Sequence, residues 1–175
     1  MKNSYNKGID MDIINIYWQG PVRLEDIQTH KDLSSENEGY GIYQIYGTHP
    51  VYGHDVLLYI GKAARQTFKK RLSQEEHWWY NAGAEEMKIY YGKLIGITPS
   101  EEKWEEMITK AEQLLIYGHR PAHNSSNINS IKKDNLQSTH VLNWGSFRNL
   151  LPEVSSMRIF DETKEKCEDF FSLEK

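Results

Sequence analysis

The 175-residue sequence contains a single cysteine, Cys167, and only five prolines. One cysteine excludes a disulfide framework within the chain, which favours a reducing compartment such as the cytoplasm. Long apolar runs are also missing, since no segment approaches the about 18 apolar residues of a membrane span and residues 1–12 lack the core of a signal peptide. We therefore expect one cytoplasmic domain with no membrane partner, long enough to bury a core without disulfide or metal staples.

The sequence also lacks an excess of positive charge. The net charge is −4, from 21 Lys and Arg residues against 25 Asp and Glu residues, which at first argues against a nucleic-acid partner. Residues 161–175 supply −3 of this charge through six acids and three lysines. Residues 62–71, in contrast, hold five cations and no acid: Lys62, Arg65, Lys69, Lys70 and Arg71. This stretch is either a solvated helix face or a surface that faces phosphate.

The order of secondary-structure signals predicts an α+β fold. Apolar residues alternate over 42–46, 57–60 and 87–95, which predicts three strands. A helix is expected from about Gln66. A longer helix is predicted from the sequence Thr98-Pro99-Ser100-Glu101, a capping box with proline at the first helical position, to about Tyr117, with Gly118 as its stop.

The flanks carry weaker signals. Residues 10–18 indicate a strand, residues 23–30 a short helix and residues 33–38 a polar hinge. Near the other end, residues 141–144 indicate a strand, and residues 147–155 a helix that Pro152 interrupts. We divide the chain into an N-terminal extension (1–38), a core (39–128) and a C-terminal extension (129–175) that packs on the core.

Glu112 stands out on the longer helix. At 100° per residue it lies on the flank of the apolar stripe that contains Ile108 and Leu115. A carboxylate at such a flank loses hydration unless a cation meets it. A divalent metal is one candidate, and an arginine or a strand backbone is the structural alternative.

Two tripeptides, Gly41-Ile42-Tyr43 and Tyr59-Ile60-Gly61, lie on consecutive predicted strands, and the second leads into the basic stretch 62–71. Glu112 and the run Arg120-Pro121-Ala122-His123-Asn124 follow in order. In this order the elements resemble a GIY-YIG nuclease over residues 39–128. The resemblance implies a small three-stranded antiparallel sheet flanked by helices.

The resemblance also implies site roles. Tyr43 would activate the attacking water, Tyr59 would help to hold phosphate and water, and Glu112 would bind one Mg²⁺ or Mn²⁺ ion. Arg71 would neutralise the charge that develops on the scissile phosphate, with Arg65 as the competing candidate. Asn124 would brace the active-site loop, although an Asx-turn is its plain structural explanation.

Other residues have supporting roles. Because a phenol has a pKa near 10, Lys62 would help by favouring the phenolate. Gly61 allows close approach of the backbone to phosphate or simply forms a turn, and Lys69 and Lys70 would contact DNA together with Lys62 and Arg65. His77 matches the additional histidine of restriction-type members or is a surface residue.

The expected function is a metal-dependent DNA endonuclease, a small restriction or defence enzyme, and members of that type work as homodimers. A catalytically idle DNA-binding or interaction module is an alternative from another class. A repair, structure-specific, single-strand or RNA nuclease is a third.

Overall fold

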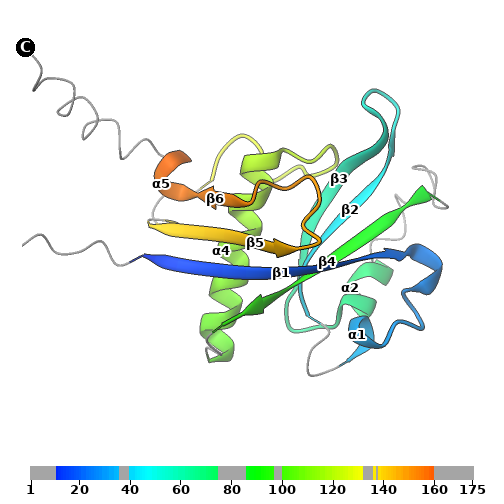
Figure 1. The fold of residues 1–175 in the computed structure, drawn as a ribbon, viewed down its shortest axis with the longest axis horizontal. Coiled ribbons are helices and arrows are strands. Elements are labelled where there is room, and N and C mark those ends of the chain that lie inside the picture. Colours follow the sequence, from blue (N-terminus) through cyan, green and yellow to red (C-terminus); the bar gives the residue numbers. More distant parts are fainter. Residues whose placement is uncertain are drawn as a thin grey trace, which may run out of the picture.

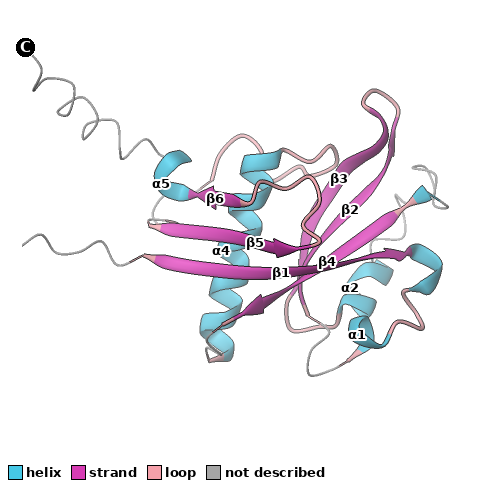
Figure 2. Cartoon of the chain, viewed as in Figure 1, coloured by secondary structure: helices cyan, strands magenta, loops and turns pink. Residues whose placement is uncertain are grey.

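The computed structural model describes residues 11–35, 40–74, 86–96, 100–131, 136 and 138–159. Its secondary structure is shown in Figures 1 and 2. The strands are β1 (Asp12–Arg23), β2 (Gly41–His49), β3 (Gly53–Ala63), β4 (Lys88–Ile95), β5 (Thr139–Gly145) and β6 (Glu153–Ser155). The helices are α1 (Lys31–Ser34), α2 (Phe68–Gln74), α4 (Glu101–His119) and α5 (Ser156–Ile159), with a 3-10 turn at Leu24–Asp26.

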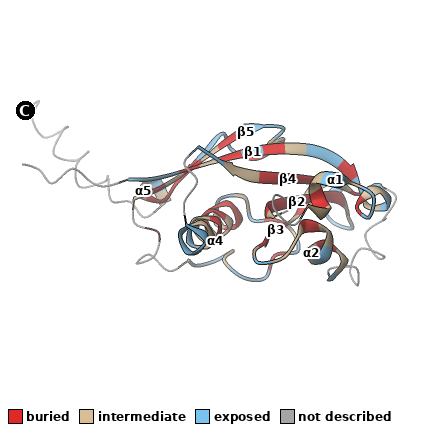
Figure 3. Cartoon of the chain, turned by 90° about the horizontal axis from the view of Figure 1, so that it is seen from below, coloured by how far each residue is buried: buried red, intermediate tan, exposed pale blue. Residues whose placement is uncertain are grey.

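The strands form one mixed sheet of six strands in the order β3-β2-β4-β1-β5-β6. The strand pair β1 and β5 is parallel, and the other neighbouring pairs are antiparallel. Seen from below, the sheet curls into a half-barrel, with β1 and β5 at the top and β3 between α4 and α2 at the bottom (Figure 3). The prediction of a small three-stranded antiparallel sheet is therefore wrong, although the chain remains α+β.

The error lies in strand pairing. The three strands of the predicted core form as β2, β3 and β4, but β4 pairs with β1 on its other side. Strand β1 then pairs with β5, where Trp18 donates its indole N–H to Asn143 Oδ1 at 2.8 Å, 125 residues away in the chain. No local pattern announces such a distant partner. The domain boundaries at 38 and 128 stay predictions, yet both flanks contribute strands to this sheet.

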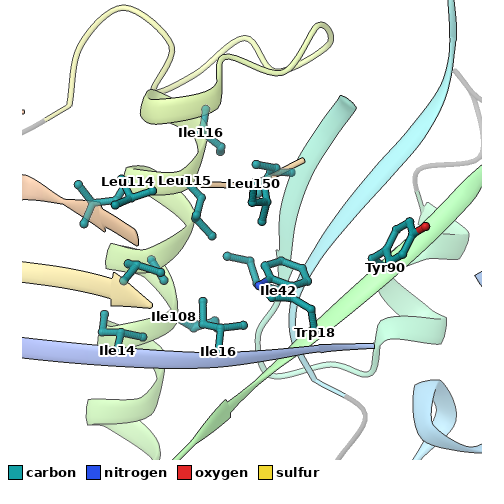
Figure 4. Packing of buried hydrophobic residues seen from close by; sticks show 14 of the residues in the cluster. Ile14, Ile16, Trp18, Ile42, Tyr90, Ile108, Leu114, Leu115, Ile116 and Leu150 are labelled. Carbon is teal, nitrogen blue, oxygen red and sulfur yellow. The ribbon is translucent and has the colours of Figure 1, made fainter. Parts of the chain in front are cut away.

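Two apolar cores cover opposite faces of the curled sheet. Strand alternation on β1 sends one set of side chains toward α4, and Figure 4 shows these packed against the helix. That core contains Ile14, Ile16, Trp18, Ile42, Ile60, Ile108, Leu114, Leu115, Ile116 and Leu150. The second core packs under α1 and α2 and contains Leu33, Tyr43, Ile45, Leu58, Phe68, Leu72, Ile89 and Tyr91. Strand β3 therefore borders both cores.

Helix α4 forms where the capping signal predicted it, with shifted ends. Ser100 is the N-cap and accepts a hydrogen bond from the Lys103 backbone N–H. The helix passes Gly118 and ends when Arg120 adopts a left-handed conformation at φ 49°. Pro121 follows and prevents further helix. This ending turns the chain back along β3.

The flanking predictions fared less well. Residues 33–38 were expected to be a hinge, but Leu33 is fully buried within α1. The predicted helix over 23–30 is replaced by the end of β1 and a 3-10 turn. The predicted helix over 147–155 is instead loop and β6, because Glu153 and Ser155 pair with β5.

Candidate active site

Strand β3 ends the sheet, so its outer backbone groups need partners from outside the sheet. The segment after α4 supplies several of them. The His123 N–H donates to Leu58 O at 2.8 Å, and the Asn124 side chain accepts from Ile60 N at 3.0 Å and donates to Ile60 O at 2.8 Å. The buried Asn124 side chain thus satisfies both backbone groups of Ile60 at the strand edge. This contact fits the bracing role that the resemblance implies.

Glu112 meets the same strand two residues further along. Its Oε2 lies 3.2 Å from Lys62 Nζ, and the Lys62 backbone N–H also donates to the carboxylate. The side chains of Glu112 and Lys62 are 17% and 29% exposed, so this pair is mostly withdrawn from water. The flank position that the helical wheel predicted for Glu112 is what lets it reach β3.

Burial raises the pKa of Glu112 above its ordinary value. The charge and hydrogen bond of Lys62, and more weakly the charge of Arg71, oppose the rise without cancelling it. The carboxylate is therefore better compensated if a further cation approaches. We call Glu112, Lys62 and Arg71 the Glu112 cluster.

The two candidate arginines lie in different surroundings. Arg71 comes from α2, beside the buried Leu72, and its charge acts on Glu112. Arg65 has a φ of 57° and a side chain that is 73% exposed, and its Nη2 lies 2.7 Å from Glu105 Oε2. Because Glu105 already neutralises Arg65, the geometry favours Arg71 as the arginine of the site.

Tyr43 and Tyr59 lie side by side over Gly61, with ring centroids 6.0 Å apart. A Cβ at position 61 would meet Tyr43 Oη at 2.5 Å and Tyr59 Cε1 at 2.6 Å. Glycine is therefore required here by the two rings, which is a stronger reason than a turn. Gly61 directly precedes Lys62, so the tyrosine pair and the Glu112 cluster are neighbours at the end of β3, although successive side chains point to opposite faces of a strand.

The two tyrosines differ in exposure. Tyr43 is fully buried, and the Phe68 ring lies 6.4 Å from its own. Tyr59 is half-buried. Of the two residues, Tyr59 is therefore the one that is partly open to solvent, which bears on which of them could act on a water molecule.

Comparison of the chain with protein-family models, with curated proteins and with solved structures found no match. A function for the chain must therefore be inferred from its own residues. Among the helices that the structure describes, none combines the length and hydropathy of a transmembrane span.

The donor set for a metal ion is sparse. In the described part of the chain, no three His, Cys, Asp or Glu side chains gather in a way that could hold a metal ion. Mg²⁺ is nevertheless commonly bound by one or two carboxylates, with water and substrate phosphate as the other ligands. Glu112, whose charge is incompletely compensated, fits that kind of substrate-completed site.

The remaining predicted residues are less central. Lys69 donates from Nζ to Gln28 O at 3.1 Å, and Lys70 is exposed on α2. His77 lies outside the described residues. Sequence reasoning overlooked Thr109, whose Oγ1 accepts from Lys62 Nζ at 2.8 Å. A threonine inside a helix carries no signal of such a role.

Proposed function

We propose that this chain is a divalent-metal-dependent DNA endonuclease whose active site is the outer end of β3. The observation that carries the proposal is the convergence of residues from three elements on one strand end. Glu112 comes from α4, Lys62 from β3 and Arg71 from α2, beside the tyrosine pair over Gly61. The resemblance of 39–128 to GIY-YIG nucleases supports the same reading.

The arrangement suits hydrolysis of a phosphodiester. Water attacks the phosphorus, the bond from phosphorus to the 3′ oxygen breaks, and the products carry 5′-phosphate and 3′-hydroxyl ends. Lys62 and Arg71 would stabilise the negative charge on the phosphate oxygens in the transition state. A metal ion on Glu112 would supply further charge stabilisation.

Tyr59 is the better candidate for accepting the proton of the attacking water. A general base must lie within hydrogen-bond reach of the proton that it removes. Tyr43 is fully buried, whereas Tyr59 reaches solvent. We therefore assign the base role to Tyr59 and a supporting role to Tyr43, which reverses the order that the resemblance implies. The proposed biological setting is restriction or defence.

A second candidate, the catalytically idle module, is favoured by one contact. Glu112 already has Lys62 as a partner at 3.2 Å, so the carboxylate and the ammonium can satisfy each other without metal or substrate.

One cleavage assay separates these functions. The purified protein is incubated with supercoiled plasmid, circular single-stranded DNA and RNA, each with Mg²⁺, Mn²⁺ or EDTA. We expect metal-dependent cutting of plasmid, and a discrete set of fragments would indicate restriction. A Glu112→Gln preparation made in parallel controls for contaminating nucleases. A folded protein that cuts no substrate with either metal would contradict the proposal and favour the idle module.

A further inference from the structure

Thr109 lies three residues before Glu112 on α4, and both contact the Lys62 ammonium. The Thr109 hydroxyl has one proton, which it donates to the Glu105 carbonyl oxygen at 2.7 Å. With its proton committed to the helix backbone, Oγ1 can only accept a hydrogen bond from Lys62. The observed distance from Lys62 Nζ to Thr109 Oγ1 is 2.8 Å. The helix therefore fixes the direction from which the ammonium is held.

The Lys62 ammonium has three protons. Among the described residues, Thr109 Oγ1 takes one and Glu112 Oε2 takes another. Two acceptors on one rigid helix define the orientation of the ammonium and hence the direction of its third proton. Because the Lys62 side chain is 29% exposed, an oxygen that arrives from solvent can approach it.

We propose that Thr109 is a positioning residue that aims the third ammonium proton of Lys62 at the scissile phosphate. This inference rests on the proposed function. A free lysine side chain samples many rotamers, and restricting it on binding costs conformational entropy. Thr109 holds the ammonium before substrate arrives, and such pre-organisation favours the transition state. Without Thr109, Glu112 alone would hold the ammonium, and the lysine could rotate about that contact.

Thr109→Val tests the proposal because valine keeps the branched shape and removes only the hydroxyl. The Glu105 carbonyl keeps its ordinary helical environment, so α4 should form. We expect kcat to fall about tenfold or more with KM nearly unchanged, and Thr109→Ser to recover most of the loss. Thr48→Val, at a hydroxyl that contacts His54 and Glu86 near the β2–β3 hairpin, is the matched control and should cut like the wild type.

A second measurement does not need activity. Nitrogen relaxation of lysine ammonium groups reports how freely each group rotates, and the Lys62 signal is assigned by its loss in Lys62→Met. We expect a restricted Lys62 ammonium in the wild type and in Thr109→Ser, and a faster-rotating one, held by Glu112 alone, in Thr109→Val.

The two readouts separate the two ideas. If the wild type cuts DNA and Thr109→Val cuts equally well, the positioning role is wrong while the nuclease proposal stands. If the wild type cuts nothing, the proposed function fails, and the ammonium measurement alone decides whether Thr109 holds Lys62. An ammonium that rotates equally in wild type and Thr109→Val overturns the inference in either case.

Discussion

Two carboxylates in this fold are each influenced by two cations, yet their pKa values shift in opposite directions. Glu112 pairs with Lys62 and is also influenced by the charge of Arg71, and burial raises its pKa. Asp55 lies between Arg148 and Lys88, with Lys88 Nζ 3.2 Å from its Oδ1. The hydrogen bond from Arg148 lowers the pKa of Asp55. Burial acts in the opposite direction, but its effect is smaller because the Asp55 side chain is 43% exposed.

The Asp55 cluster, which comprises Asp55, Arg148 and Lys88, connects β3 and β4 to the loop before β6. The Arg148 guanidinium carbon lies 4.2 Å from the centroid of the Tyr46 ring. Burial raises the pKa of Tyr46 to about 12, so its hydroxyl stays protonated and donates to Gln44 Oε1 at 2.9 Å. These contacts tie the loop before β6 to the β2–β3 hairpin, and two cations compensate the Asp55 carboxylate.

The contrast shows that a carboxylate influenced by two cations can have either a lowered or a raised pKa. The partners of Asp55 outweigh the cost of burying its charge, so its pKa is lowered. Lys62 and Arg71 do not outweigh that cost for Glu112, so its pKa is raised. A site that must accept another cation should show the second condition. Parallel mutations in the two clusters therefore test this distinction.

The largest expected effect is on cleavage by the two amide variants. Glu112→Gln should lower the cleavage rate roughly a thousandfold or more, because a bound metal contributes several kcal/mol to the transition state. Asp55→Asn should leave the rate unchanged. Single-turnover cleavage of plasmid in Mg²⁺ measures both.

Stability should respond the other way round. Asp55→Asn should lower the free energy of unfolding by about 1 kcal/mol, a value kept small because the pair is partly exposed. Glu112→Gln should unfold at the same or a higher denaturant concentration. Equal cleavage by the wild type and Glu112→Gln would show that Glu112 has a structural role and does not bind a catalytic metal ion.

The tyrosines give the next largest effect. Tyr59→Phe should lower the cleavage rate by about a hundredfold or more, in the range for loss of a general base. Tyr43→Phe should be affected less, and Tyr46→Phe, in contact with the Asp55 cluster, should cut normally. Rates measured across pH 6 to 10 rank the three variants. A larger loss in Tyr43→Phe would mean that the buried phenol reaches the water after a conformational change.

Arg71→Gln should lower the cleavage rate by roughly a hundredfold, the usual loss on removing one donor that stabilises transition-state charge. Arg65→Gln is the matched control, since its charge is neutralised by Glu105. We expect its rate to stay within a few-fold of the wild type at low salt. If Arg65→Gln were the more damaging change, the catalytic arginine would have been assigned to the wrong element.

The smallest effect concerns acid stability and has opposite signs in the two clusters. The stabilisation from Asp55 is present above its ordinary pKa and is lost as the pH falls through its lowered folded-state pKa. Ionisation of Glu112 is instead unfavourable to folding, so its contribution worsens as the pH rises from its ordinary pKa through its raised folded-state pKa.

Urea unfolding between pH 3 and 7 tests this difference. The advantage of the wild type over Asp55→Asn should grow with pH, and its stability relative to Glu112→Gln should decline. Parallel curves for the two comparisons would show that burial does not control Glu112.

Much of this architecture could be predicted from local features of the sequence. The capping residues before α4 and the alternation in β2, β3 and β4 are signals between residues close in the chain, and those elements form. The flank position of Glu112 also followed from helical geometry. The partners of an edge strand, however, depend on where distant segments return. Lys62 meets Thr109 only because α4 packs beside β3, and Asn124 reaches β3 only because the chain turns back after α4 ends at Arg120.

The parallel pairing of β1 with β5 has a consequence for how the chain reaches this structure. Strand β1 lies inside the sheet, but one of its two neighbours is 125 residues further along the chain. Pairings across such long separations slow folding, because a large loop must close before the contact forms. During synthesis β1 can pair with β4 first, and its other edge must wait for β5 to leave the ribosome. We expect chaperones that recognise unpaired strands to bind the nascent chain in that interval.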